Sequence, residues 1–159
     1  MSTYLLGTQC LFDLGRNDGG ALQQWFEGLP PQRGLFVEDI SLSAFSVSII
    51  RRHFSLNPPA RTAERTLHEN LETLIERFQT AGQVIGASPA VVDAWSRLRD
   101  EDIVYELPGG RSQRCGFEEK LVLATALCGN SGRSFILLDR SQSAFAELGI
   151  AVQNPYRPS

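Results

Sequence analysis

The stretch YLLGTQCLFDL, residues 4–14, decides how the rest of the chain is interpreted. Its apolar residues 4–6 indicate a short buried strand, and Gly7 and Thr8 follow that strand directly. In open α/β sheets, ligands bind beyond the carboxyl ends of the strands. This strand end carries no charge, metal ligand or nucleophile, and the nearest acid is Asp13. Gly7 and Thr8 therefore lie at the edge of the sheet where ligands are expected to bind, but they carry no charged, metal-ligating or nucleophilic group.

The size and composition of the chain indicate one soluble domain spanning residues 1–159. The hydrophobic fraction is 42% and the mean hydropathy is -0.14, values typical of an ordinary globular protein. No apolar run is long enough to span a bilayer, and the N-terminus lacks a signal-peptide pattern. The three cysteines show no CxxC or Cys/His spacing, so we expect reduced thiols in a cytoplasmic protein.

The charge of the chain gives limited guidance about partners. A net charge of -3 argues against a strongly basic nucleic-acid binder. The one local basic cluster is Arg51-Arg52-His53. It is either a solvated helix end or a contact with a phosphate or partner, and its sequence alone leaves both open.

Short apolar strands alternate with helices along the chain, which predicts an α/β domain with a mostly parallel sheet of about five short strands. We expect strands at residues 4–6, 35–37, 84–85, 134–138 and 150–152, and helices at 18–27, 41–54, 60–78, 88–98, 117–127 and 143–148. The stretch 106–116 is polar and glycine-rich, and we interpret it as a flexible connection without the pattern of a phosphate-binding loop.

The helix at residues 60–78 has the clearest pattern. A single apolar stripe runs along it, formed by Leu67, Leu71, Leu74, Ile75 and Phe78. The stripe packs either on the core of the domain or on a second subunit or partner helix, and its spacing does not distinguish these.

Four stretches in this order resemble the motifs of one family. They are LLGTQCL at residues 5–11, SLSAF at 41–45, EEKLVLATA at 118–126, and LLDRS at 137–141 followed by VQNP at 152–155. The chain thereby resembles PIN domains, small α/β nucleases that often serve as ribonuclease toxins of bacterial toxin–antitoxin pairs. The resemblance spans nearly the whole chain and implies a PIN-like three-layer domain with a central, mostly parallel sheet.

The departures from the family pattern concern its metal site. PIN nucleases hold Mg²⁺ or Mn²⁺ with several carboxylates that converge at the strand ends. Carried over position by position, the family's acidic or polar positions become Gly7, Ala44, Ser141 and Ala144, and only Glu119 keeps a carboxylate. Removing clustered carboxylates also removes their mutual repulsion, as expected where function has moved away from catalysis.

Other acids are candidates to replace the lost ligands. The resemblance places Asp13 shortly after the first strand and Asp139 at the end of the fourth, so the candidate metal and catalytic residues are Asp13, Glu119 and Asp139. We interpret Asp39 and Glu118 as surface carboxylates, because their spacing does not match a lost ligand.

Two functions from different classes follow from the resemblance. The leading hypothesis is a PIN-fold protein with no metal, or only weakly bound Mg²⁺ or Mn²⁺, that acts by binding. Its expected partners are RNA, an antitoxin-like protein or a second copy of the chain, and not a membrane. The alternative is a divergent Mg²⁺- or Mn²⁺-dependent endoribonuclease. A small-molecule enzyme on a flavodoxin-like sheet is disfavoured, because no nucleotide-binding glycine pattern is present.

Overall fold

The structure is a computed structural model that describes residues 3–17, 20–27, 40–106, 109–129, 135–140 and 143–156. Its central sheet has five strands in the order β3-β2-β1-β6-β7, all paired in parallel. They are β1 (Tyr4–Leu6), β2 (Ile40–Ser43), β3 (Val84–Ile85), β6 (Ile136–Leu138) and β7 (Val152–Gln153). The α/β class and the parallel five-strand sheet predicted from the sequence are thus confirmed.

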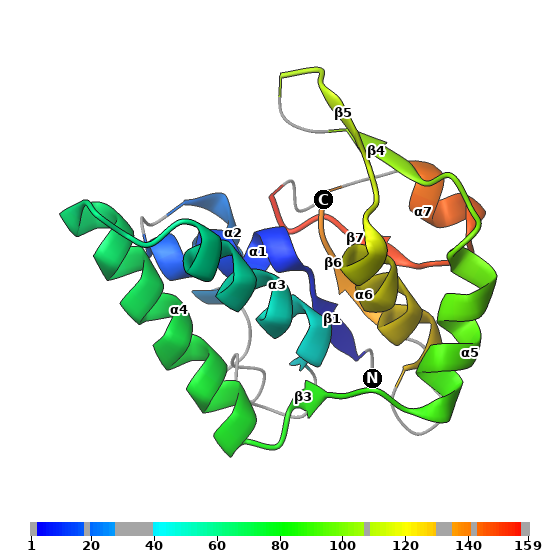
Figure 1. Cartoon of the computed structure of the whole chain (residues 1–159), viewed down its shortest axis with the longest axis horizontal. Helices are drawn as coiled ribbons and strands as arrows, with labels where there is room; N and C mark the ends of the chain where they lie inside the picture. Colours follow the sequence, from blue (N-terminus) through cyan, green and yellow to red (C-terminus); the bar gives the residue numbers. More distant parts are fainter. Residues whose placement is uncertain are drawn as a thin grey trace.

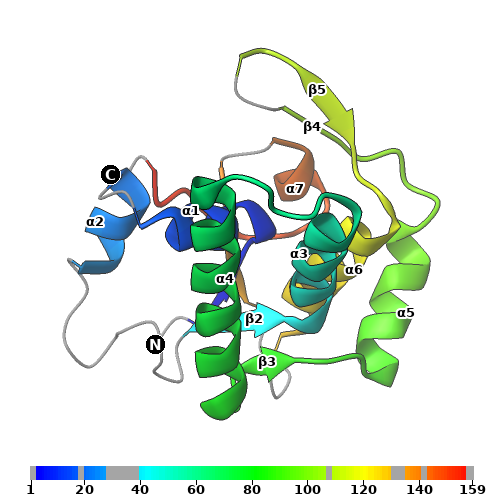
Figure 2. The same cartoon turned by 60° about the vertical axis from the view of Figure 1, so that its left-hand side comes forward.

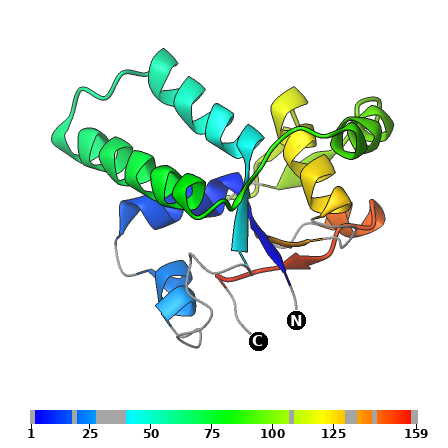
Figure 3. The same cartoon turned by 90° about the horizontal axis from the view of Figure 1, so that it is seen from below.

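Helices cover both faces of this sheet, which gives three layers (Figure 1). On one side lie α1 (Thr8–Arg16), α2 (Ala21–Glu27) and α4 (Thr62–Thr80). On the other lie α5 (Pro89–Leu98), α6 (Phe117–Cys128) and α7 (Ser143–Glu147). Figure 2 shows α3 (Ala44–Leu56) between α4 and α6, and Figure 3 shows α4 and α6 on opposite sides of the strands.

Successive residues of the central strands face opposite layers. Leu6 and Leu138 belong to the hydrophobic cluster under α1 and α4, whereas Leu5 and Leu137 belong to the cluster under α5 and α6. This alternation is the two-residue period of a strand that is buried on both faces. It explains why the strands are continuous apolar runs rather than alternating ones.

The apolar stripe of α4 belongs to the intramolecular core. Leu71, Ile75 and Phe78 are fully buried, and α4 lies against α1. The helices approach closely at Gly15, where a Cβ atom would lie 2.6 Å from Cδ2 of Leu71. The Asn70 side chain also donates a hydrogen bond to the Gly15 carbonyl, at 2.8 Å. The core interpretation of the stripe is therefore the correct one.

Two predicted elements differ from the structure near the N-terminal half of the sheet. The helix expected at 41–54 is wrong for residues 41–43, which belong to β2, and the chain continues from β2 into α3 without an intervening loop. Ser43 ends the strand and begins the helix, since its hydroxyl accepts a hydrogen bond from the Phe45 amide at 3.2 Å. The sequence also failed to indicate α1, which follows Gly7 directly. The strand expected at 35–37 lies outside the described residues.

The predicted flexible connection at 106–116 is also wrong in part. Residues 112–114, inside this stretch, form β5 (Ser112–Arg114), and β4 (Val104–Glu106) ends at its first residue; the two strands are an antiparallel pair with Tyr105 opposite Gln113. This hairpin is a separate two-stranded sheet that projects from the body of the domain (Figures 1 and 2). Gly109 and Gly110 both adopt positive φ angles between the two strands, which glycine tolerates without strain.

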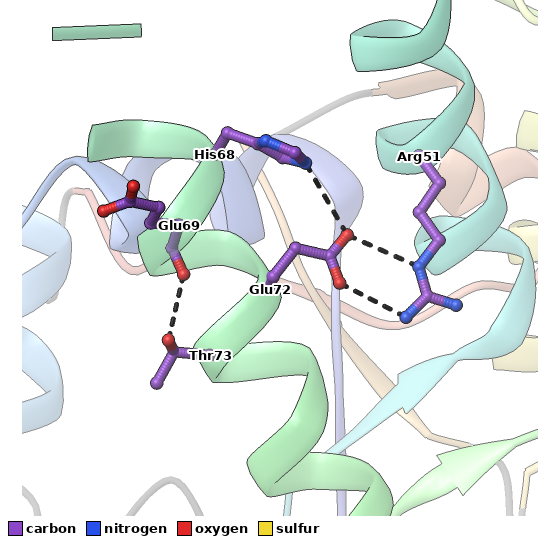
Figure 4. A network of polar contacts seen from close by, with 5 residues as sticks. All are labelled: Arg51, His68, Glu69, Glu72 and Thr73. Atoms are coloured by element: carbon purple, nitrogen blue, oxygen red, sulfur yellow. Dashed lines mark hydrogen bonds and ion pairs between the residues drawn. The ribbon is translucent and has the colours of Figure 1, made fainter. Parts of the chain in front are cut away.

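The basic cluster on α3 is engaged within the domain. Arg51 donates two hydrogen bonds to the Glu72 carboxylate of α4, at 3.4 and 3.3 Å, and His68 lies 3.9 Å from the same carboxylate (Figure 4). Arg52 pairs with Glu118 on α6 at 2.8 Å. These contacts join α3 to both neighbouring helices, which supports the interpretation as a solvated helix end. Among the described helices, none is both long and apolar enough to cross a membrane.

Candidate binding cleft

A cleft of about 430 Å³ lies at the carboxyl ends of β1 and β6. Leu6 and Leu138 are paired in these strands, and the Gly7 amide donates to the Leu138 carbonyl at 2.9 Å, so Gly7 and Asp139 follow at the same edge. The cleft is lined by Gly7, Thr8, Gln9, Phe12, Asp13, Arg16, Ile49, Tyr105, Glu106, Gln113, Cys115, Glu119, Val122, Leu123, Leu137, Asp139, Arg140 and Phe145. All three acids predicted from the sequence, Asp13, Glu119 and Asp139, therefore line one cleft.

Asp139 fills the space beside Gly7. A Cβ atom on Gly7 would lie 3.2 Å from Oδ2 of Asp139 and only 2.6 Å from the Leu138 carbonyl oxygen. The other carboxylate oxygen, Oδ1, accepts a hydrogen bond from the Arg140 amide at 2.7 Å. Burial raises the pKa of Asp139 from its ordinary value of 3.8 to about 6, and the nearby carboxylates of Asp13 and Glu119 add to this effect.

Asp13 is held by donors of the protein itself. Tyr156, near the C-terminus, donates its hydroxyl proton to Oδ2 of Asp13. Gln9 and Arg16 contact Oδ1 at 3.2 and 3.3 Å. Burial raises the pKa of Tyr156, and the adjacent Asp13 carboxylate acts in the same direction. The guanidinium group of Arg140 lies over the Tyr156 ring, 4.4 Å from its centre.

Glu119 lies in the first turn of α6 and is also engaged. Its Oε2 atom accepts hydrogen bonds from the Gly116 amide at 3.1 Å and from the Tyr105 hydroxyl at 3.2 Å. The first contact satisfies a backbone donor at the start of the helix, where a carboxylate is also favoured by the helix dipole. Burial raises the pKa of Tyr105, and so do the charge and hydrogen bond of Glu119.

The donor set does not fit the Mg²⁺ or Mn²⁺ that the PIN resemblance implies. Within the described ranges, no three His, Cys, Asp or Glu side chains come together as a group able to hold a metal ion. Asp13 and Glu119 accept hydrogen bonds from tyrosine hydroxyls, which hold these carboxylates in their present orientations. A small octahedral cation such as Mg²⁺ demands well-placed oxygen ligands, and these carboxylates are directed to other partners.

The structure also corrects the position of the second family acid. Ala44 does not line the cleft; it lies in an open hollow beside Arg51 and Arg52. The residue that α3 presents to the cleft is Ile49. Ala44 is the first residue of α3, directly after the unexpected strand β2, and Ile49 lies more than one helical turn further along.

Of the other acids considered from the sequence, Glu118 does not line the cleft. Glu118 pairs with Arg52 on the surface at 2.8 Å, as expected for the neighbour of Glu119 on a helix. Asp39 and the family position Ser141 lie outside the described residues.

Sequence reasoning missed three residues that shape the cleft: Ile49, Tyr105 and Tyr156. Tyr156 follows the Asn154-Pro155 pair directly and reaches Asp13 across most of the chain. The position of Tyr156 beside a recognised motif was the one available signal. No sequence signal indicated Tyr105 or Ile49, because their positions in the cleft depend on the hairpin and on the start of α3.

Solved structures with a similar fold match nearly the whole of this chain. One, the structure of FitAB bound to an IR36 DNA fragment, superposes with a TM-score of 0.67 and 19% identity, covering 99% of this chain and 98% of that one. A second, FitAcB from Neisseria gonorrhoeae, gives a TM-score of 0.66 and 22% identity, covering 97% and 99%. No protein-family model and no curated protein matches the chain by sequence.

These similarities and the element order together define the fold. The parallel five-strand sheet, its helical layers and the near-complete structural coverage confirm the PIN-like fold expected from the sequence motifs. At this level of identity the likeness concerns the fold, so function has to be argued from the cleft.

Proposed function

We propose that this chain acts by binding a partner protein in the cleft, in the manner expected of a PIN-fold protein with an antitoxin-like partner, and not by metal-dependent cleavage of RNA. The main support for the proposal is that acidic side chains of the cleft already make hydrogen bonds within the domain. Tyr156 holds Asp13, and Tyr105 holds Glu119, so two of the three carboxylates have a role within the domain. One of the similar structures, FitAB bound to a DNA fragment, is an assembly, and this similarity supports the proposal that the present chain also acts in a complex.

The charge of the cleft favours a basic protein segment over RNA. Among the residues that the structure describes, four acidic side chains line it, against two basic ones, Arg16 and Arg140. Arg16 is paired with Asp13, and Arg140 lies on the Tyr156 ring. Without a cation, such a surface repels the phosphates of a nucleic acid.

The remaining lining suits a polypeptide. Apolar side chains such as Phe12, Ile49 and Phe145 provide contact area for a partner's side chains.

The experiment compares two labelled probes by fluorescence anisotropy: a short peptide of alternating arginine and leucine, and a single-stranded RNA of similar length. The proposal expects saturable binding of the peptide and none of the RNA. Asp139→Asn should weaken peptide binding about tenfold, whereas Glu76→Gln, an exposed acid on α4, should not. Tighter binding of the RNA, or equal effects of the two variants, would reject the proposal.

A further inference from the structure

We propose that Glu119 is a positioning residue that fastens the β4–β5 hairpin to the body of the domain through Tyr105, so that the hairpin forms one side of the binding cleft. The resemblance to nucleases assigns this carboxylate to a metal, and the geometry gives it a different task. The inference rests on the proposed function only in treating the cleft as the binding site.

The hairpin is attached to the body of the domain at its base and through side chains such as Tyr105 and Cys115, which pack against the hydrophobic cluster under α5 and α6. Among the described strands, its two strands pair with each other and with none of the five-stranded sheet. All three residues of β5 are exposed. At its base the Cys115 amide donates to the Ile103 carbonyl at 2.8 Å. A two-stranded hairpin on its own is marginally stable in water, so its attachment to the body decides its position.

The start of α6 supplies that attachment from two sides. Glu119 accepts the Tyr105 hydroxyl at 3.2 Å with the same oxygen that accepts the Gly116 amide, so the helix itself orients the carboxylate. The next residue, Lys120, donates from Nζ to the carbonyl oxygens of Arg99 and Glu101, at 2.8 and 2.6 Å. These carbonyls belong to the segment that leads into β4. Consecutive residues of one helical turn therefore hold the entry to the hairpin and its first strand.

The fastened hairpin adds chemistry to the cleft. Tyr105, Glu106, Gln113 and Cys115 all line the cleft, and all lie in the hairpin or at its base. Glu106 contributes one of the four acidic side chains. A partner segment that enters the cleft thus meets the hairpin directly, and loosening the hairpin removes part of the surface that selects the partner.

Hydrogen exchange of the intact protein, followed by mass spectrometry, tests this role without any partner. Tyr105→Phe removes the hydroxyl but keeps the ring and the charge of Glu119. It should accelerate exchange in residues 104–106 and 112–115 by at least about threefold, because a hydrogen bond to a charged group is lost. Glu119→Ala should do the same, and Glu119→Gln, which can still accept both hydrogen bonds, should restore nearly normal exchange.

The matched control is Tyr156→Phe, which removes the other tyrosine–carboxylate contact, to Asp13, and should leave exchange in the hairpin unchanged. Unchanged hairpin exchange in a folded Tyr105→Phe protein would overturn the proposal, as would equal acceleration by Tyr156→Phe. The arginine–leucine peptide gives a separate reading. If exchange responds as expected but the wild type does not bind the peptide, the positioning role stands and the proposed function fails.

Discussion

The carboxylate of Asp139 lies where a side chain at position 7 would lie. A Cβ atom on Gly7 would be 3.2 Å from Oδ2 of Asp139 and 2.6 Å from the Leu138 carbonyl oxygen. A side chain at position 7 therefore has no free space to occupy. The Leu138 backbone and the Asp139 carboxylate take that space, so the residue tolerated after β1 depends on the residues at the end of β6.

Gly7→Ala should accordingly destabilise the protein by roughly 1–3 kcal/mol, because the new methyl group meets a backbone oxygen that cannot move aside. Gly116→Ala is the matched control, since Gly116 also precedes a helix in extended conformation but has open space around it. Urea unfolding of both variants measures the difference. Equal losses would mean that the close approach at Gly7 has no energetic consequence.

Asp139→Asn should stabilise the protein at high pH. A raised pKa in the folded state means that the stability contributed by this group is complete below its ordinary value of 3.8 and is lost as the pH rises through about 6. The variant carries no charge, so its advantage should grow between pH 4 and pH 6 to roughly 1–2 kcal/mol. Melting curves at pH 4.5 and pH 8 check this. An advantage that does not change with pH would contradict the burial and crowding of this carboxylate.

A carboxylate placed at Ile49 should create a cation site that one at Ala44 does not. Ile49 lines the cleft with Asp139 and Glu119, whereas Ala44 lies in a different hollow. Ile49→Glu should lower the melting temperature without metal, because acids are added to an acidic cleft. Mn²⁺ should then raise it by several degrees more than in Ala44→Glu. An equal response of the two variants would contradict the placement of Ile49, and not Ala44, in the cleft.

Local patterns predicted the α/β class, the strands at residues 4–6 and 136–138 and the apolar stripe of α4, because each depends on residues close in the sequence. They predicted neither the order of the strands nor the surface against which the stripe packs. The same approach failed where a strand continued into a helix at Ser43, since no turn residue separates the two. Local sequence patterns also could not predict the contacts that Asp13 and Glu119 make. The tyrosine that holds Asp13 lies 143 residues away in the sequence, and the one that holds Glu119 lies in a hairpin that the glycine-rich stretch concealed.

Calorimetric titration of the wild-type protein with Mn²⁺ tests the central claim most directly. Because the tyrosine hydroxyls and the start of α6 already engage Asp13 and Glu119, we expect no saturable binding in the micromolar range. Ile49→Glu, titrated in the same way, should give a measurable site and shows that the assay detects one. Saturable micromolar binding by the wild type, abolished in both Asp139→Asn and Glu119→Ala, would contradict the account and favour the divergent Mn²⁺-dependent endoribonuclease.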